Sequence, residues 1–307
     1  DSFIYQPSRQ FDVKPGCKDY ALTLGSLRFR ANQLVTRGRM RWVMRLLPSN
    51  IPTTDQIGLP DQALKAYLEA KNGLILVCGA TESGKTTTIA SLIKARAERR
   101  REHIITFEDP VEYVFPENLP SLVTQREMGT DELDFASSLK ASLRQAPDII
   151  VVGEIRDGAS AEIALQAAET GHVVVATMHT SSAAQTVQRF LKLIPSERQE
   201  NAMLSFADSF RMILCQQLLF SEEHQQRFPI HEILLSYDSI NGMIRRGDFK
   251  RLDHELETGT SKGLQTFEQS LKDRAEIGFR PNTTPVTGYS PAEVTAYLRA
   301  QEVVLPN

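Results

Sequence analysis

The chain has 307 residues, enough for about two domains, and a formal net charge of −3. This charge argues against a broad basic surface, so no nucleic-acid partner is expected. The three cysteines, Cys17, Cys78 and Cys215, lie too far apart in the sequence to suggest a C-x-x-C metal pair or a disulfide framework. The chain shows no signal peptide and no apolar run of membrane-spanning length, so we expect a cytoplasmic protein without direct membrane insertion.

The N-terminal part of the chain, residues 1–50, contains short alternating or apolar stretches. Residues 20–24 and 27–31 predict the strands of a small sheet, whereas residues 40–47 fit a strand or a short helix equally well. A polar stretch bounded by prolines follows, and we place the linker between domains at residues 51–60. Directly after it, a short helix is predicted with Pro60 in its first turn.

Residues 79–86 match the phosphate-binding pattern G-x-x-x-x-G-K-S/T. They are Gly79, Ala80, Thr81, Glu82, Ser83, Gly84, Lys85 and Thr86, and Thr87 follows them. A buried strand is predicted before the loop and a helix after it, which is the context that the motif requires. Backbone N–H groups of such a loop bind phosphate oxygens, Lys85 reaches the terminal phosphates, and the Thr86 hydroxyl ligates Mg²⁺. The sequence therefore predicts a nucleotide site.

Strands and helices alternate around and beyond this loop. The predicted strands are residues 74–78, 103–107, 149–152 and 173–178, and the predicted helices follow Lys85 or cover residues 135–144, 159–170 and 183–193. This alternation predicts a mostly parallel sheet with helices on both faces and with nucleotide at the carboxyl ends of the strands. Further along, residues 196–220 read as an amphipathic helical region, and residues 231–235 as one more strand.

Acidic side chains follow two of the predicted strands. Glu108, Asp109 and Glu112 come directly after the strand at residues 103–107. One such carboxylate can orient or deprotonate the attacking water, and another can hold Mg²⁺ through water, although an acidic turn at a solvated edge explains the pattern equally well. Glu154 follows the strand at residues 149–152, where the second acid of a nucleotide site completes the Mg²⁺ shell; without that context it is an ordinary loop acid.

Two histidines bracket the strand at residues 173–178. His179 lies at its carboxyl end, where it can contact phosphate or sense its loss, whereas His172 lies at the opposite end and is expected to be structural. Basic residues cluster at positions 94–101, where the helix after the phosphate loop ends. We interpret this cluster as a solvated face that complements the helix dipole, because no aromatic residues interleave it.

Four segments in this order resemble a known family. They are residues 79–86, Glu108-Asp109-Pro110-Val111-Glu112, Gly153-Glu154-Ile155-Arg156-Asp157, and Gly171-His172 with His179-Thr180. Together they resemble the type II/type IV secretion ATPase superfamily and, within it, the type IV pilus retraction ATPases, the PilT family. The resemblance implies an α/β fold: a RecA-like P-loop ATPase domain with a mostly parallel sheet over residues 61–307, with a C-terminal helical region at about residues 238–307. A small, partial PAS-like α+β domain would precede it.

The resemblance also implies roles for single residues. Residues 79–86 would be the Walker A loop, Glu112 the water-activating base with Glu108 as the fallback, and Glu154 an atypical Walker B acid that holds Mg²⁺ together with Thr86. His179 would belong to the family's histidine box. Positively charged donors near the γ-phosphate stabilise the transition state, and the arginines available in the N-terminal domain are Arg28, Arg30, Arg39 and Arg41. Which of them reaches nucleotide stays open.

By the same resemblance, the chain would form a homo-hexamer that binds ATP and Mg²⁺. It would power pilus retraction at the cytoplasmic base of the pilus, against an inner-membrane platform protein. The lack of a four-cysteine insertion favours retraction over extension or secretion. The alternatives are an accessory ATPase that acts with a paralogous pilus motor, an extension or secretion ATPase, and a RecA-like nucleic-acid translocase, which the net charge disfavours.

Glu82 departs from the family pattern inside the phosphate loop, where glycine is common. A carboxylate at this position repels phosphate unless it points outward, and glycine tolerates backbone angles that glutamate does not. We therefore hypothesise weakened or altered nucleotide affinity.

Overall fold

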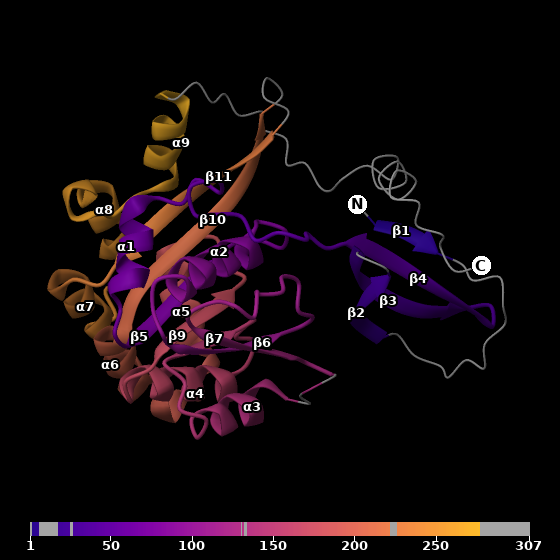
Figure 1. The fold of residues 1–307 in the computed structure, drawn as a ribbon. Helices are drawn as coiled ribbons and strands as arrows, with labels where there is room; N and C mark the ends of the chain where they lie inside the picture. Colours follow the sequence, from indigo (N-terminus) through magenta and orange to yellow (C-terminus); the bar gives the residue numbers. More distant parts are fainter. Residues whose placement is uncertain are drawn as a thin grey trace.

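The computed structural model describes residues 2–5, 18–24, 27–129, 131, 134–221 and 226–276. Within these ranges the chain forms two separate sheets joined by an extended segment, with most helices gathered around the larger sheet (Figure 1). Cys17 and the C-terminal part of the predicted helical region lie outside the described residues.

The N-terminal sheet is antiparallel, and its described strands follow the spatial order β1-β4-β3-β2. The strands are β1 (Ser2–Tyr5), β2 (Lys18–Leu24), β3 (Leu27–Thr36) and β4 (Arg39–Leu46). Residues 40–47, for which the sequence fits a strand or a short helix equally well, thus belong almost entirely to strand β4. The reason is pairing with β3, where Phe29 lies opposite Leu46 and Ala31 opposite Met44, so that Phe29, Ala31 and Met44 share a small buried core. That this region is a partial PAS-like domain stays a prediction.

The larger sheet is mostly parallel, as predicted. Among the described residues its strands are β5 (Gly73–Cys78), β6 (His103–Glu108), β7 (Leu122–Glu127), β8 (Ile149–Val152), β9 (Val173–Met178), β10 (Phe210–Ser221) and β11 (Gln226–Leu235). The order is β11-β10-β5-β9-β8-β6-β7, and only the pairing of β10 with β11 is antiparallel among these. Strands β5 and β9 are buried along their whole length, which explains their mostly apolar sequences; Thr177 of β9 is polar, and its hydroxyl donates to the carbonyl oxygen of Gly153.

Among the described residues, the α-helices are α1 (Asp61–Glu69), α2 (Lys85–Ala97), α3 (Phe135–Ser142), α4 (Gly158–Glu169), α5 (Ala183–Leu193), α6 (Gln199–Ser209), α7 (Asp238–Arg245), α8 (Lys250–Thr258) and α9 (Phe267–Glu276). Helices α2 to α6 lie in the connections between strands of the larger sheet, whereas α1 precedes it and α7, α8 and α9 follow it. Asp134, Asp157 and Ser182 cap α3, α4 and α5 by accepting hydrogen bonds from backbone N–H groups of the first turn. These caps fix where each loop after a strand turns into a helix.

Two sequence predictions about this domain need correction. The helix predicted over residues 196–220 ends at Ser209, and the chain continues as strand β10, which pairs with the buried strand β5. Strand β7 was missed because it lies at the sheet edge: its sequence is mostly polar, and its first residue, Leu122, is 63% exposed. In both cases pairing with a distant strand decides the structure against the local pattern.

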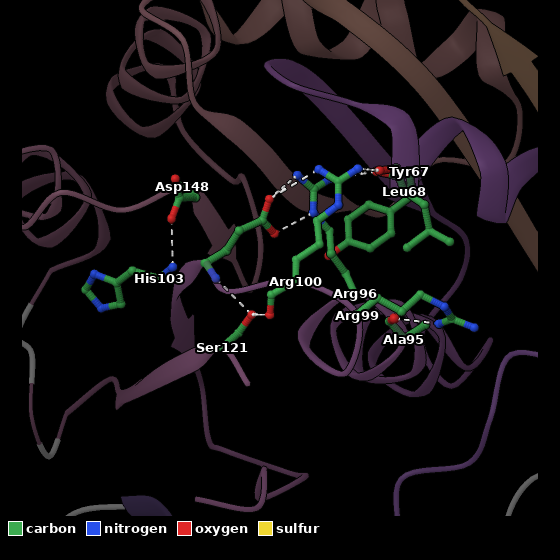
Figure 2. A network of polar contacts seen from close by, with 10 residues as sticks. Tyr67, Leu68, Ala95, Arg96, Arg99, Arg100, His103, Ser121 and Asp148 are labelled. Carbon is green, nitrogen blue, oxygen red and sulfur yellow. Dashed lines mark hydrogen bonds and ion pairs between the residues drawn. The ribbon is translucent and has the colours of Figure 1, made fainter. Parts of the chain in front are cut away.

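The basic cluster at the end of α2 is not simply a solvated face. Arg96 is only 2% exposed, and its guanidinium donates to both carboxylate oxygens of Glu102 (2.7 and 2.8 Å) and to the carbonyl oxygen of Tyr67 (2.8 Å), as Figure 2 shows. The same guanidinium lies over the Tyr67 ring, 5.4 Å from its centroid. Arg100, one turn later, donates to the carbonyl oxygen of Leu68. These contacts fasten the end of α2 to α1 and to the start of β6.

Replacing Arg96 by methionine is expected to lower the free energy of unfolding by about 3 kcal/mol, because it leaves the half-buried Glu102 carboxylate without its bidentate partner. Urea denaturation measures this loss, and Arg101→Met, at an exposed position close to the same helix end, is the matched control. Since α2 has 13 residues, the phosphate loop lies about 20 Å away, and nucleotide affinity of the folded variant should stay unchanged. Equal stability of the two variants would contradict the role given to Arg96.

Candidate nucleotide-binding site

The phosphate loop, residues 79–86, joins the buried strand β5 to helix α2 in a conformation that depends on two glycines. Gly79 has φ +147° and Gly84 has φ +88°. A Cβ at Gly79 would lie 2.4 Å from the carbonyl oxygen of Gln216, and a Cβ at Gly84 would lie 2.7 Å from the Gln216 side-chain nitrogen. The loop therefore packs against β10 so closely that only glycine fits at both positions. Backbone N–H groups of such a loop and the start of the helix that follows it are the donors that phosphate sites of this kind use.

Further loop side chains fit a bound phosphate and its metal ion. The Oγ of Ser83 is buried and has no hydrogen-bond partner among the described residues. Thr86, in the first turn of α2, is exposed beside the loop, where its hydroxyl could ligate Mg²⁺. Thr87 instead contacts the hydroxyl of Tyr113 at 3.0 Å, which ties α2 to the loop after β6. Thr81 is exposed.

Lys85 is the centre of a polar chain that links three of the predicted site residues. Its Nζ donates to the carbonyl oxygens of Gly79 (2.9 Å) and Ala80 (2.7 Å) and lies 3.5 Å from Nδ1 of His179. The other ring nitrogen of His179, Nε2, lies 3.4 Å from a carboxylate oxygen of Glu154. An ammonium group only donates hydrogen bonds, so Nδ1 accepts from Lys85 and Nε2–H faces Glu154. The ends of β5, β8 and β9 thus meet at one point.

Charge and burial set the protonation states of Lys85 and Glu154. Burial lowers the pKa of Lys85, against the opposing effect of nearby anionic groups that include Glu154 and Glu112. For Glu154, partial burial acts to raise the pKa. The hydrogen bond and charge of Arg156, 2.7 Å away, and those of His179 act in the opposite direction and outweigh burial, so the pKa of Glu154 is lowered. Glu154 is therefore an ionised carboxylate at neutral pH. Arg156 was not predicted as a site residue; its place two residues after Glu154 was the available signal.

Glu108 and Glu112 occupy different environments in the loop after β6. The Glu108 carboxylate accepts from the Thr106 hydroxyl (2.7 Å) and from the Gln125 amide (3.0 Å), and burial raises its pKa. Glu112 is partly exposed, and Arg30 lies 3.7 Å from its carboxylate. Glu108 thus has one carboxylate oxygen, Oε1, engaged by two neighbouring side chains, whereas Glu112 presents a more accessible carboxylate.

Arginines of the N-terminal sheet contact the site in the same chain. Arg28 donates to the carbonyl oxygen of Val111 (3.1 Å), and Arg30 pairs with the Glu112 carboxylate. Arg45, on the neighbouring strand β4, forms an ion pair with Glu82 of the phosphate loop at 2.9 Å. The sequence analysis missed Arg45, although strand register could have found it, because Arg45 lies directly opposite Arg30.

Arg39 and Arg41 lie at the other end of β4, near the turn that Figure 1 shows pointing away from the larger sheet. Arg39 is six residues from Arg45, which corresponds to about 20 Å along a strand. The structure therefore does not bring these two arginines to the phosphate loop of their own chain. A role of either at nucleotide stays a prediction.

The phosphate loop accommodates the Glu82 carboxylate by directing it toward the N-terminal sheet, where it pairs with Arg45. The backbone of Glu82 has φ +65°, in the left-handed region that favours glycine. We expect Glu82→Gly to raise affinity for ADP about three- to fivefold by removing negative charge and backbone strain, and Arg45→Ala to lower it by a similar factor. Titration calorimetry of both variants measures the effect. Unchanged affinity in both would show that Glu82 does not influence the bound phosphate.

Among the described residues, no helix is long and apolar enough to cross a membrane.

The mostly parallel sheet, the glycine-bounded loop and the acids at the carboxyl ends of neighbouring strands define an ATPase with a RecA-like P-loop domain. A family model described as "Type II/IV secretion system protein" matches residues 18–237, and the chain belongs to this family.

Known proteins resemble the chain over most of its length. YggR of Escherichia coli strain K12 is 39% identical over 267 residues, which cover 87% of this chain and 81% of YggR. The type IV pilus ATPase PilU of Pseudomonas aeruginosa is 35% identical over 266 residues, 87% of this chain and 69% of PilU. A crystal structure of the pilus retraction motor PilT with bound ADP superimposes with a TM-score of 0.79 at 36% identity, covering 92% of this chain and 80% of that one.

Proposed function

We propose that the chain is a subunit of a homo-hexameric motor that hydrolyses ATP to power type IV pilus retraction. The observation that carries the proposal is the contact between the N-terminal sheet and the site: Arg45 pairs with Glu82 of the phosphate loop, and Arg30 with Glu112. Phosphate groups and these carboxylates attract the same guanidinium groups. Binding and loss of phosphate would therefore change the angle between the two domains, which is the motion a motor needs.

In this proposal each predicted site residue has one task. The loop amides and Lys85 bind the phosphates, and Glu112 orients the attacking water and accepts its proton. Glu154 and Thr86 would hold Mg²⁺, which neutralises phosphate charge when bound. His179 would sense the terminal phosphate through Lys85 and Glu154. An arginine of the N-terminal domain would stabilise the developing charge, with Arg28 and Arg30 positioned in the same chain and Arg39 and Arg41 available to a neighbouring subunit.

The names of two similar proteins, a type IV pilus ATPase and a pilus retraction motor, support action on a pilus. In this proposal the chain acts at the cytoplasmic base of the pilus, where an inner-membrane platform protein would receive the domain motion. In the same proposal the N-terminal domain covers residues 1–50, the linker residues 51–60, and the ATPase domain residues 61–307.

Deletion of the gene in its native host tests the retraction role. A retraction motor predicts cells that keep or gain surface pili and lose twitching motility. Bald cells would instead support an extension motor, and intact pili with a secretion defect would support a secretion ATPase. A salt-sensitive interaction with DNA would point to a nucleic-acid translocase.

The second candidate function is an accessory ATPase that acts beside a paralogous pilus motor. The observation that favours it is Glu82, a carboxylate in the phosphate loop whose partner is an arginine of the other domain. An accessory subunit predicts weak turnover by the pure protein and stimulation when the paralogue is added. Vigorous ATP hydrolysis by the pure protein alone would exclude this candidate.

A further inference from the structure

A buried glutamine of strand β10 touches the phosphate loop from behind. Gln216 is 2% exposed, and its side-chain Nε2 donates to the carbonyl oxygen of Ser83 at 2.6 Å. Its Oε1 accepts from the hydroxyl of Thr88, in the second turn of α2, at 2.7 Å. One amide group therefore spans the last turn of the loop and the start of the helix that follows it.

The orientation of this amide follows from hydrogen-bond chemistry. A carbonyl oxygen only accepts, so the group that faces Ser83 must be the NH₂ and the group on the opposite side must be the oxygen. Nε2 of His231, on strand β11, lies 3.2 Å from that oxygen and must be the protonated ring nitrogen. The Ser83 carbonyl oxygen fixes the orientation of the amide, because a rotated amide would place oxygen against oxygen there, and His231 supports this orientation by donating to the amide oxygen.

Within the described part of the chain, one ring nitrogen of His231 is left without a hydrogen bond. The side chain is fully buried, and burial, assisted by the charge of Arg274, lowers its pKa to about 3, so the ring is neutral. With the proton on Nε2, the other nitrogen, Nδ1, is a buried acceptor without a hydrogen-bond partner among the described residues. A buried unsatisfied acceptor costs about 1–3 kcal/mol. A packed apolar residue would avoid that cost, which indicates that the contact with Gln216 is what the position requires.

The pair also reaches the C-terminal helices. The backbone N–H of His231 donates to the Ser270 hydroxyl of α9 at 3.0 Å, and Arg274, one turn later on α9, donates to the carbonyl oxygen of Gly58 before α1. Strand β11 is also paired with β10 along their backbones, and the contact between His231 and Gln216 adds a side-chain link from β11 and α9 to the phosphate loop.

We infer that Gln216 is a positioning residue for ATP hydrolysis, which holds the phosphate loop in its binding shape, and that His231 acts through Gln216. This inference rests on the ATPase activity and not on the proposed role in pilus retraction. It assigns the loop an internal support that lies outside the residues 79–86 that bind the phosphates.

Two variants isolate the hydrogen bond to Ser83. Gln216→Leu removes both halves of the amide, whereas Gln216→Glu keeps an acceptor for Thr88 and His231 and, when ionised, replaces the donor toward Ser83 by a negatively charged oxygen. Both are expected to raise KM for ATP and the Kd for ADP about tenfold or more, with a smaller effect on kcat, because the loop loses its shape before nucleotide binds. Gln217→Leu is the matched control, since Gln217 is the next residue on β10, is exposed and should leave both constants unchanged.

A double-mutant test separates positioning from general stability. His231→Leu is expected to weaken ADP binding severalfold in the wild-type chain and to have no further effect in the Gln216→Leu background, because His231 acts only through Gln216. His231→Gln, whose amide can donate to Gln216, should restore most of the affinity. The melting temperature of each variant is measured alongside, so that loss of folding is recognised.

The inference is overturned if both Gln216 variants bind ADP as wild type does, or if His231→Leu weakens binding equally in both backgrounds. Loss of ADP binding by the wild-type chain itself would contradict the ATPase assignment rather than this inference. The two failures are therefore distinguishable in one set of titrations.

Discussion

Replacing Glu112 by glutamine is expected to lower kcat for ATP hydrolysis at least 100-fold while the Kd for ATP changes less than about twofold. The amide cannot accept the proton of the attacking water, but it keeps the size of the side chain and the surrounding loop. The carboxylate of Glu112 is accessible and pairs only loosely with Arg30, at 3.7 Å, so little of the fold depends on its charge. Steady-state kinetics and equilibrium binding of a slowly hydrolysed ATP analogue measure the two constants separately.

Two companion variants make this result specific. Glu117→Gln removes an exposed carboxylate five positions further along the same loop and should leave kcat unchanged. Glu108→Gln is expected to act mainly on stability, because Glu108 is hydrogen-bonded to Thr106 and Gln125. Normal turnover by Glu112→Gln would move the role of the base to Glu108 or to another residue.

The pH dependence of the rate distinguishes these two carboxylates in the wild-type protein. A general base works only when deprotonated, so kcat falls as the pH drops through the pKa of the base. Burial raises the pKa of Glu108, so a mechanism that used Glu108 would lose activity at a pH above the usual range of a glutamate. We expect no acid limb in that raised range, because Glu108 is not the assigned base. An acid limb near neutral pH would contradict the assignment of Glu112.

Lys85→Ala is expected to raise the Kd for ATP and ADP at least 100-fold and so to abolish measurable ATPase activity. The ammonium group is the only cation of the phosphate loop itself, residues 79–86, and charged hydrogen bonds to phosphate contribute about 1.5–3 kcal/mol each. Lys85 also donates to the carbonyl oxygens of Gly79 and Ala80, so the loop loses part of its own bonding as well. Titration calorimetry with magnesium present measures the loss.

Lys94→Ala provides the control for this variant, because Lys94 lies on the same helix α2 and donates to the carbonyl oxygen of Ile51 rather than to the loop. A melting temperature close to that of the wild type would show that Lys85→Ala remains folded. Retained ADP affinity in a folded Lys85→Ala variant would contradict the assignment of residues 79–86 as the phosphate site.

Much of the fold was predictable because its signals are local. The glycines at positions 79 and 84, Lys85 and the apolar runs of β5, β8 and β9 are adjacent in the sequence to the elements that they specify. Hydrophobic patterns failed where pairing overrides them. The edge strand β7 has too few apolar residues to stand out, and β10 has the apolar content of a helix. Pairing with β6 makes β7 a strand, and pairing with β5 and β11 makes β10 one.

The sequence by itself determined the class of site: a phosphate loop between a strand and a helix, with acids and a histidine after the next strands. Only the tertiary structure decided which distant side chains complete it. Arg45 reaches Glu82 across 37 positions, Gln216 reaches Ser83 across 133, and Arg96 is buried against Tyr67 rather than solvated. The physical reason is that hydrogen bonds and ion pairs act over a few ångströms in space, whereas sequence patterns report on neighbours along the chain.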